Sequence, residues 1–239
     1  MFLSRLSFLN ERIPNRKVYP FSIAAFKGLE TIEFTSNVTF FVGENGSGKS
    51  TLLEAIAYKC DFNTAGGGRN NTYEVPSSES ALGEFIRLSW APKITNGFFL
   101  RAESLYNFAS HIDSLGLEAY KPYGGKSLHK QSHGESFLSL FANRFGKQGI
   151  YLLDEPEAAL SPARQLTLLR IIRELEQEGQ SQFIIATHSP IILAYPDAQI
   201  LDFDTSPVSK TEYEDTSHYQ ITKGFLDNRD RYLRKLFEE

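Results

Sequence analysis

The sequence predicts an α/β fold with a mostly parallel core sheet flanked by helices. Four short apolar runs predict strands, and two of them are apolar without alternation, which is typical of strands buried on both faces. Segments with helical periodicity separate these runs, so the core strands are expected to run parallel. The runs span residues 38–42, 149–155, 183–187 and 198–203.

The segments between these strands are predicted to contain helices, a loop and a hairpin. Residues 49–60 place their apolar side chains on one helical stripe, and a later helix is expected to begin with Ser161 as its cap and to end at Gly179. Residues 61–80 are rich in Gly, Asn and Ser and predict an exposed loop. Two β-prone runs within residues 84–103 predict a hairpin, followed by a helix that starts near Leu105.

Composition narrows the class of protein. The 239 residues carry a formal net charge of −4, so no global basic field indicates nucleic-acid binding, although a local basic patch stays open. No window approaches eighteen apolar residues, and the first residues lack the pattern of a signal peptide. Cys60 is the single cysteine, which excludes an intrachain disulfide. We therefore expect a cytoplasmic protein that is not associated with a membrane.

The segment from Gly43 to Ser50, GENGSGKS, matches the P-loop pattern between an apolar strand and a helix. Glycines let backbone N–H groups turn toward phosphate oxygens, and a helix N-terminus adds positive partial charge. Lys49 places a full charge near the β and γ phosphates, and Ser50 offers a hydroxyl to Mg²⁺. A glycine-rich turn without a ligand is the alternative. The candidate nucleotide-binding residues are Gly43, Asn45, Gly46, Ser47, Gly48, Lys49, Ser50 and Thr51.

A second candidate element is the apolar strand that ends in Asp154 and Glu155. Asp154 is expected to bind Mg²⁺ with Ser50, as in the Walker B element. Glu155 is positioned to orient or deprotonate an attacking water. A surface strand that happens to end in acidic residues is the alternative, and the pairing with the P-loop argues against it.

The order of DEP, AALSP and ATHSP after the P-loop resembles the ABC ATPases, and residues 21–56 resemble the soluble RecF and SMC branch. The resemblance implies one ABC-type head over residues 1–239, with an N-terminal antiparallel β part. Its nucleotide-binding core would comprise residues 1–60 and 140–239. Residues 61–139 would form an inserted loop, hairpin and helical lobe.

The resemblance also implies roles for three further segments. A signature-like motif would contact the γ phosphate bound by a second subunit, and its Ser132 and Glu135 also fit a capping box, which is compatible with that role. The D-loop would lie at the dimer seam, and the alternative is that this segment is simply a helix cap. His188 would reach the γ phosphate, while the other four histidines are expected to be ordinary surface or core residues. The signature residues are Ser132, His133, Gly134 and Glu135, and the D-loop residues are Ala159, Leu160 and Ser161.

Two usual elements of the family are less distinct. The aromatic side chain that stacks on adenine is expected to be Tyr19, Phe21 or Phe26. No convincing Q-loop glutamine is present, and Arg101 or Glu103 is the candidate replacement near the γ phosphate.

These elements predict an Mg²⁺-dependent ATPase whose catalytic residues are Lys49, Glu155 and His188. ATP would be hydrolysed in a nucleotide-sandwich homodimer, in a DNA-related or defence process. The alternative is a slow ATP-sensing module that gates a partner such as a nuclease or toxin. A P-loop kinase or GTPase is disfavoured because the sequence shows neither lid arginines nor a guanine-recognition motif.

Overall fold

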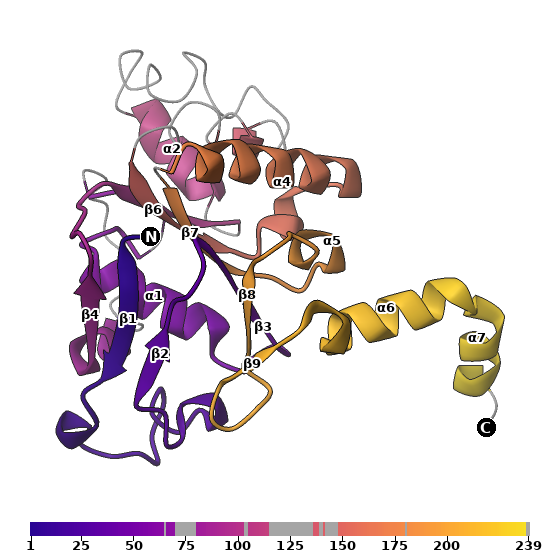
Figure 1. Cartoon of the computed structure of the whole chain (residues 1–239), viewed down its shortest axis with the longest axis horizontal. Helices are drawn as coiled ribbons and strands as arrows, with labels where there is room; N and C mark the ends of the chain where they lie inside the picture. The colour runs from indigo at the N-terminus through magenta and orange to yellow at the C-terminus, as the bar shows by residue number, and fades with distance from the viewer. Residues whose placement is uncertain are drawn as a thin grey trace.

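A computed structural model describes most of the chain, and Figure 1 shows its arrangement. The described residues are 1–64, 66–69, 80–102, 105–114, 136–138, 141, 148–179 and 181–237.

The core is a six-stranded sheet in the order β5-β6-β7-β3-β8-β9. Its first five strands are parallel, and β9 pairs antiparallel with β8 at the edge. All four strands predicted from apolar runs lie in this sheet, which confirms the predicted parallel core. The strands are β3 (Val38–Val42), β5 (Gly97–Arg101), β6 (Gly149–Asp154), β7 (Ser181–Ala186), β8 (Gln199–Asp202) and β9 (Ser209–Thr211).

A second sheet is antiparallel and three-stranded, with the order β2-β1-β4. Its strands are β1 (Leu3–Phe8), β2 (Thr31–Glu33) and β4 (Ile86–Trp90). This sheet confirms the N-terminal antiparallel part that the resemblance implied.

The predicted hairpin within residues 84–103 is wrong. The two strands exist, but β4 pairs with β1 while β5 pairs with β6 in the other sheet. The two strands also differ in burial: residues 97–100 of β5 are all buried at the edge of the core sheet, whereas β4 is buried fully only at Ile86. The division of the chain at residues 61–139 stays a prediction.

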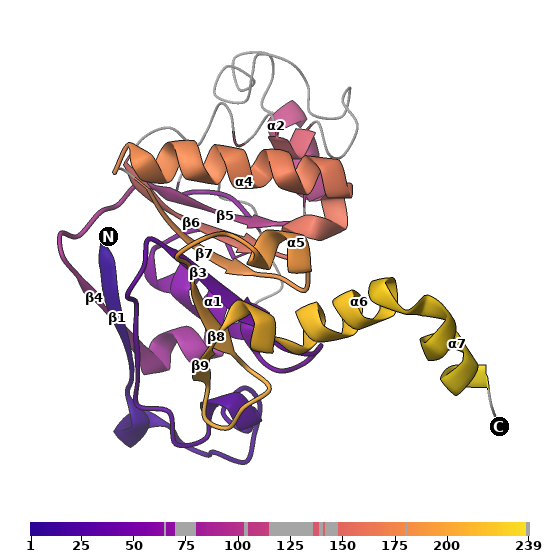
Figure 2. The same ribbon diagram turned by 45° about the vertical axis from the view of Figure 1, so that its right-hand side comes forward.

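Helices cover both faces of the core sheet. Helix α1 lies between the two sheets, and α4 runs across the opposite face, where α2 and α5 also lie (Figure 2). Among the described residues, no helix is both long and apolar enough to cross a membrane. The helices are α1 (Lys49–Lys59), α2 (Leu105–Ser114), α4 (Pro162–Gln177), α5 (Pro190–Leu193), α6 (Ser217–Asp227) and α7 (Arg229–Phe237). The 3₁₀ turns are η1 (Asn10–Arg12), η2 (Ala24–Phe26), η3 (Ser80–Phe85), η6 (Pro156–Ala159) and η7 (Tyr213–Asp215).

The core sheet separates two apolar clusters, because neighbouring side chains on a strand point to opposite faces. Phe40 packs with α2 and α4, while Phe41 packs with α1 and the antiparallel sheet. The sequence predicted one apolar stripe on helix α1. Every residue from Thr51 to Ala57 is buried, so the helix is buried over more of its surface than predicted. The position between two sheets explains why it is buried on all sides.

Two buried glutamines join the sheets. The Gln182 side chain on β7 accepts hydrogen bonds from the backbone N–H groups of Phe2 and Leu3 at 2.9 and 2.8 Å, and donates to the Leu3 carbonyl at 2.9 Å. Gln199 on β8 accepts from Thr35 N–H at 2.9 Å and donates to the Glu33 carbonyl at 2.8 Å. These side chains satisfy backbone groups where the two sheets do not pair.

We expect Gln182→Leu to lower the free energy of unfolding by about 3 kcal/mol, because three buried backbone groups of Phe2 and Leu3 lose their partners. Urea unfolding measures the change. Gln177→Leu, the same substitution at an exposed position of α4, is the control and should leave stability nearly unchanged. Equal effects in both variants would contradict this account.

Candidate functional site

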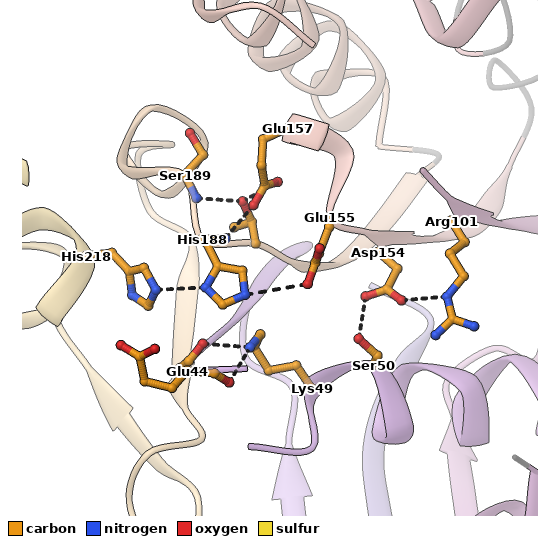
Figure 3. A network of polar contacts seen from close by, with 12 residues as sticks. Glu44, Lys49, Ser50, Arg101, Asp154, Glu155, Glu157, His188, Ser189 and His218 are labelled. Carbon is orange, nitrogen blue, oxygen red and sulfur yellow. Dashed lines mark hydrogen bonds and ion pairs between the residues drawn. The ribbon is translucent and has the colours of Figure 1, made fainter. Parts of the chain in front are cut away.

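The candidate functional residues gather along one edge of the core sheet. In an open parallel sheet, ligands bind outside the carboxyl ends of the strands. The P-loop follows β3, His188 follows β7, and Asp154 and Glu155 lie at the end of β6 (Figure 3). Arg101 ends β5, and its Cα is paired with Asp154 in the sheet register. The topology therefore brings together residues that lie far apart in the sequence.

The P-loop adopts a backbone that requires glycine. Gly46 and Gly48 have φ values of +81° and +106°, in the region that L side chains rarely adopt. The Lys49 ammonium group donates to the carbonyls of Gly43 and Glu44 at 2.6 and 2.9 Å. Burial lowers the pKa of Lys49, while the carboxylates of Glu155, Asp204 and Asp154 oppose that shift.

Asp154 is 4% exposed and lies between Ser50 and Arg101. The Ser50 hydroxyl donates to one carboxylate oxygen at 2.9 Å, and Arg101 Nε donates to the other at 3.1 Å. Arg101 also pairs with Glu54. Burial raises the pKa of Asp154, whereas Arg101 and the Ser50 hydrogen bond lower it. The site holds one buried carboxylate against a hydroxyl and a guanidinium group.

Glu155 has an unusual backbone conformation. Its φ and ψ are 49° and 52°, in the left-handed region that non-glycine residues seldom occupy. This conformation lets the chain turn sharply after β6 into η6. The Glu155 side chain is 37% exposed, and its Oε1 lies 3.5 Å from Nε2 of His188. That distance marks an electrostatic contact rather than a strong hydrogen bond.

Glu157 holds the segment that carries His188. Its carboxylate accepts from the Thr187 hydroxyl at 2.8 Å and from the His188 backbone N–H at 2.5 Å. Burial raises the pKa of Glu157, and the hydrogen bonds that it accepts oppose that shift. Sequence reasoning missed this role because a second glutamate after the DEP motif carries no distinctive local pattern.

His218 lies directly against His188, with Nε2 2.9 Å from Nδ1 of His188 (Figure 3). His218 is one of the four histidines that were expected to be ordinary surface or core residues, and it contacts a candidate site residue. It comes from α6, thirty positions further along the chain. No sequence signal links the two residues, because α6 approaches the sheet edge only through the tertiary fold.

Asp204 is a further residue that the sequence did not single out. It follows β8, and its Oδ1 accepts the backbone N–H of Glu44 at 2.7 Å. A Cβ on Gly43 would lie 2.9 Å from the same oxygen, so only glycine fits at this point. The position of Asp204 just beyond a predicted parallel strand was the one available clue.

The residues present fit a magnesium nucleotide. Ser50 and Asp154 supply the hard oxygen ligands that Mg²⁺ prefers. Nothing lies within 4 Å of a Cβ built on Gly46, so the loop is open there. Among the buried side chains of the described residues, the Ser47 hydroxyl is one without a hydrogen-bond partner. An anion bound by the loop would offer that hydroxyl an acceptor.

Several predicted residues lie outside the described part of the chain. These are the signature residues Ser132, His133, Gly134 and Glu135, together with Glu103. Their roles stay predictions.

The D-loop residues are described. Leu160 is 5% exposed and belongs to the core, while Ser161 is exposed at the start of α4 and makes no capping hydrogen bond with its side chain. Gln165 donates to the Leu160 carbonyl at 3.1 Å and accepts from Ser189 Oγ at 2.6 Å. The D-loop is thereby linked to the segment that follows His188.

The three aromatic candidates for adenine stacking differ in exposure. Phe26 is 4% exposed and packs against Phe8, and Phe21 packs edge-on against Phe85. Tyr19 is 61% exposed, and its hydroxyl lies 3.2 Å from that of Thr51 on α1. Of the three, Tyr19 is the exposed one, and its hydroxyl contacts the P-loop helix.

Comparison with protein families gives two matches. Residues 21–95 match a model described as an AAA domain. Residues 136–194 match a model described as an AAA domain, putative AbiEii toxin, Type IV TA system.

Curated relatives and solved structures agree with these matches. A xylose import ATP-binding protein from Moorella thermoacetica is 24% identical over 88% of this chain and 46% of its own length. A ribose import ATP-binding protein from Streptococcus agalactiae is 30% identical over 66% of this chain and 36% of its own length. The SMC head bound to the C-winged helix domain of ScpA has a TM-score of 0.52 at 16% identity, covering 93% of this chain and all of that one. The chain is thus similar in sequence to the ATP-binding proteins of ABC importers, and its fold is that of ABC-type P-loop ATPase heads.

A transporter ATP-binding cassette in its ADP conformation has the same fold, with a TM-score of 0.50 at 17% identity and full coverage of both chains. At the level of the family, the matches support ATP binding and hydrolysis. The chain spans less than half the length of the xylose import protein that it matches.

We expect Glu157→Ala to lower the free energy of unfolding by about 2 kcal/mol, because the Thr187 hydroxyl and the His188 N–H lose their shared acceptor. Hydrogen exchange at the His188 amide should accelerate, which mass spectrometry or NMR can measure. Glu30→Ala, at an exposed position, is the matched control. Unchanged protection of the His188 amide would show that Glu157 does not hold this segment.

Proposed function

We propose that this protein binds Mg·ATP at the edge of the core sheet and hydrolyses it to ADP and phosphate. The observation that carries the proposal is the convergence of Lys49, Asp154, Glu155 and His188 from three strand ends. Each offers a group that phosphate hydrolysis requires: a cation, a metal ligand, a base and a second polar group near the base.

The P-loop residues would hold the triphosphate. The backbone N–H groups between Gly43 and Thr51 would face phosphate oxygens, and Lys49 would exchange its bonds to two loop carbonyls for the β and γ phosphates. Ser50 and Asp154 would hold Mg²⁺, which neutralises charge on the phosphates when it is bound. The proposed nucleotide-binding residues are Gly43, Asn45, Gly46, Ser47, Gly48, Lys49, Ser50 and Thr51.

Glu155 is the proposed general base. Its exposed carboxylate follows the buried Asp154 directly, so one acid can serve the metal while the next accepts a proton from water. His188 lies beside Glu155 and would contact the γ phosphate through Nε2. Arg101 would balance the charge of Asp154 and of Glu54, with which it pairs.

Tyr19 is the proposed adenine-stacking residue. Its exposed ring and its contact with Thr51 place it beside the helix that begins the phosphate site. Flat aromatic faces bind nucleobases by stacking, with limited dependence on the base.

The complete site is proposed to need two chains. Ser132 and Gly134 of a second molecule would close over the γ phosphate, as the resemblance implies, with Ala159, Leu160 and Ser161 near the seam. Contacts that a subunit supplies in trans can accelerate phosphoryl transfer by about a thousandfold or more. Loss of the γ phosphate would remove the contacts that hold the two molecules together, so hydrolysis would open the dimer.

We expect Lys49→Ala to weaken Mg·ATP binding about 100-fold, because one charge-assisted contact to the phosphates is lost. Isothermal titration calorimetry on the folded variant measures this directly. Lys59→Ala, at the exposed far end of α1, removes the same charge and should bind ATP normally. An unchanged titration for Lys49→Ala would place the phosphates elsewhere.

Glu155→Gln should bind Mg·ATP but hydrolyse it at least about 100-fold more slowly, because the base is lost. With hydrolysis blocked, dimers should accumulate with Mg·ATP in light scattering at micromolar protein. Glu30→Gln serves as the control for the loss of one acid. A Glu155→Gln protein that stays monomeric with Mg·ATP would contradict the proposed dimer. A Glu155→Gln protein with full activity would contradict the role of Glu155 as the general base.

A second candidate is a slow ATP-sensing module that gates a partner such as a nuclease or toxin. The match of residues 136–194 to a model described as a putative AbiEii toxin of a Type IV TA system favours it. A tight ATP complex with negligible hydrolysis, together with a partner that co-purifies from the native host, would support this function. A DNA-related role stays a prediction of the resemblance, and salt-dependent retention on duplex DNA with ATP tests it.

A further inference from the structure

The contact between His218 and His188 fixes how the two rings can share a proton. Nδ1 of His188 and Nε2 of His218 lie 2.9 Å apart, so one nitrogen must donate and the other must accept. The other ring nitrogen of His188, Nε2, lies 3.5 Å from the Glu155 carboxylate. The choice of donor between the two histidines therefore decides whether His188 presents an N–H group or a nitrogen lone pair to Glu155.

Electrostatics favours one of the two arrangements. If His188 donated from Nδ1, its Nε2 would turn a lone pair toward the Glu155 carboxylate, which is repulsive. If His218 donates instead, His188 accepts at Nδ1 and carries its proton on Nε2, facing Glu155. Burial, together with the nearby positive charge of Lys49, lowers the pKa of His188, which favours the neutral ring that this arrangement requires.

The N-terminal end of α6 is held firmly enough to keep His218 in place. The Thr216 side chain accepts the Tyr219 N–H at the start of α6 at 3.4 Å. Tyr213 donates to the Pro190 carbonyl at 3.0 Å and packs against the Tyr219 ring, with the ring centroids 4.6 Å apart. Beyond this attachment, α6 and α7 project away from the body (Figure 1).

We propose that His218 is a positioning residue of the ATPase site, which donates from Nε2 to His188 and holds His188 as the tautomer whose Nε2–H faces Glu155 and the γ phosphate. The Ser217 hydroxyl lies 3.4 Å from Nδ1 of His218, and it can donate to that nitrogen when His218 carries its proton on Nε2. The role of His218 in turnover rests on the proposed hydrolysis of ATP. The tautomer of His188 does not depend on that proposal.

The tautomer can be measured without nucleotide. In the full chain labelled with ¹⁵N-histidine, we expect the His188 signals to show a protonated Nε2 and an unprotonated Nδ1, assigned by comparison with His188→Gln. His218→Phe keeps a ring but no N–H, and should shift His188 toward a mixture of tautomers. His218→Gln restores an amide N–H at a similar reach and should restore the signal. An Nδ1–H tautomer in the wild type, or no change in His218→Phe, would overturn the proposal.

Kinetics tests the consequence for hydrolysis. We expect His218→Phe to lower kcat about 10-fold, as for other residues that orient a functional side chain, with KM for ATP changed less than twofold. His218→Gln should recover most of kcat, and Ile221→Ala, at an exposed position of α6, should match the wild type. Wild-type kcat in His218→Phe would refute the role in turnover.

The two failures are distinguishable. A wild-type protein that hydrolyses no ATP overturns the proposed function, while the histidine signals still decide the tautomer. An active wild type whose His218 variants are unchanged in both measurements overturns the inference alone. Should His218→Phe not fold, His218→Gln and His218→Asn carry the test, because the shorter asparagine should not reach His188.

Discussion

The parallel alignment of β5, β6, β7, β3 and β8 is the constraint on which the candidate site depends. It places five carboxyl ends at one edge, so the groups that follow each strand meet without any local sequence relationship. Apolar clusters cover both faces of this sheet, with α2, α4 and α5 on one side and α1 on the other. A site assembled on rigid strand ends can hold charged groups at defined distances.

The charged side chains along this edge differ in their burial and in their partners. Asp154 is buried, and its carboxylate is compensated by Arg101 and Ser50. Glu155, the next residue, is turned outward by its left-handed backbone and stays partly exposed. Two adjacent carboxylates thus have different surroundings, which suits one to a metal and the other to a proton. The backbone conformation at Glu155 is what separates the two environments.

The segment after β7 is held from two sides. Glu157 binds its backbone from the η6 side, and His218 contacts the His188 ring from α6. Gln165 adds a link from the D-loop through Ser189. A displacement of the segment that carries His188 would therefore alter its contacts with η6, with the start of α4 and with the base of α6. These contacts give the projecting α6–α7 segment a direct connection to the candidate site.

The sequence by itself determined the parallel core, the P-loop and the acidic end of β6, because apolar runs, glycine spacing and paired carboxylates are local patterns with a direct physical cause. It misplaced β4 and β5 as a hairpin, since their actual partners, β1 and β6, lie far from them in the sequence and are brought to them only by the tertiary fold. It could not find Glu157, Asp204 or His218. These are common residue types whose importance arises from neighbours far along the chain, and only the tertiary structure brings those neighbours within hydrogen-bond distance.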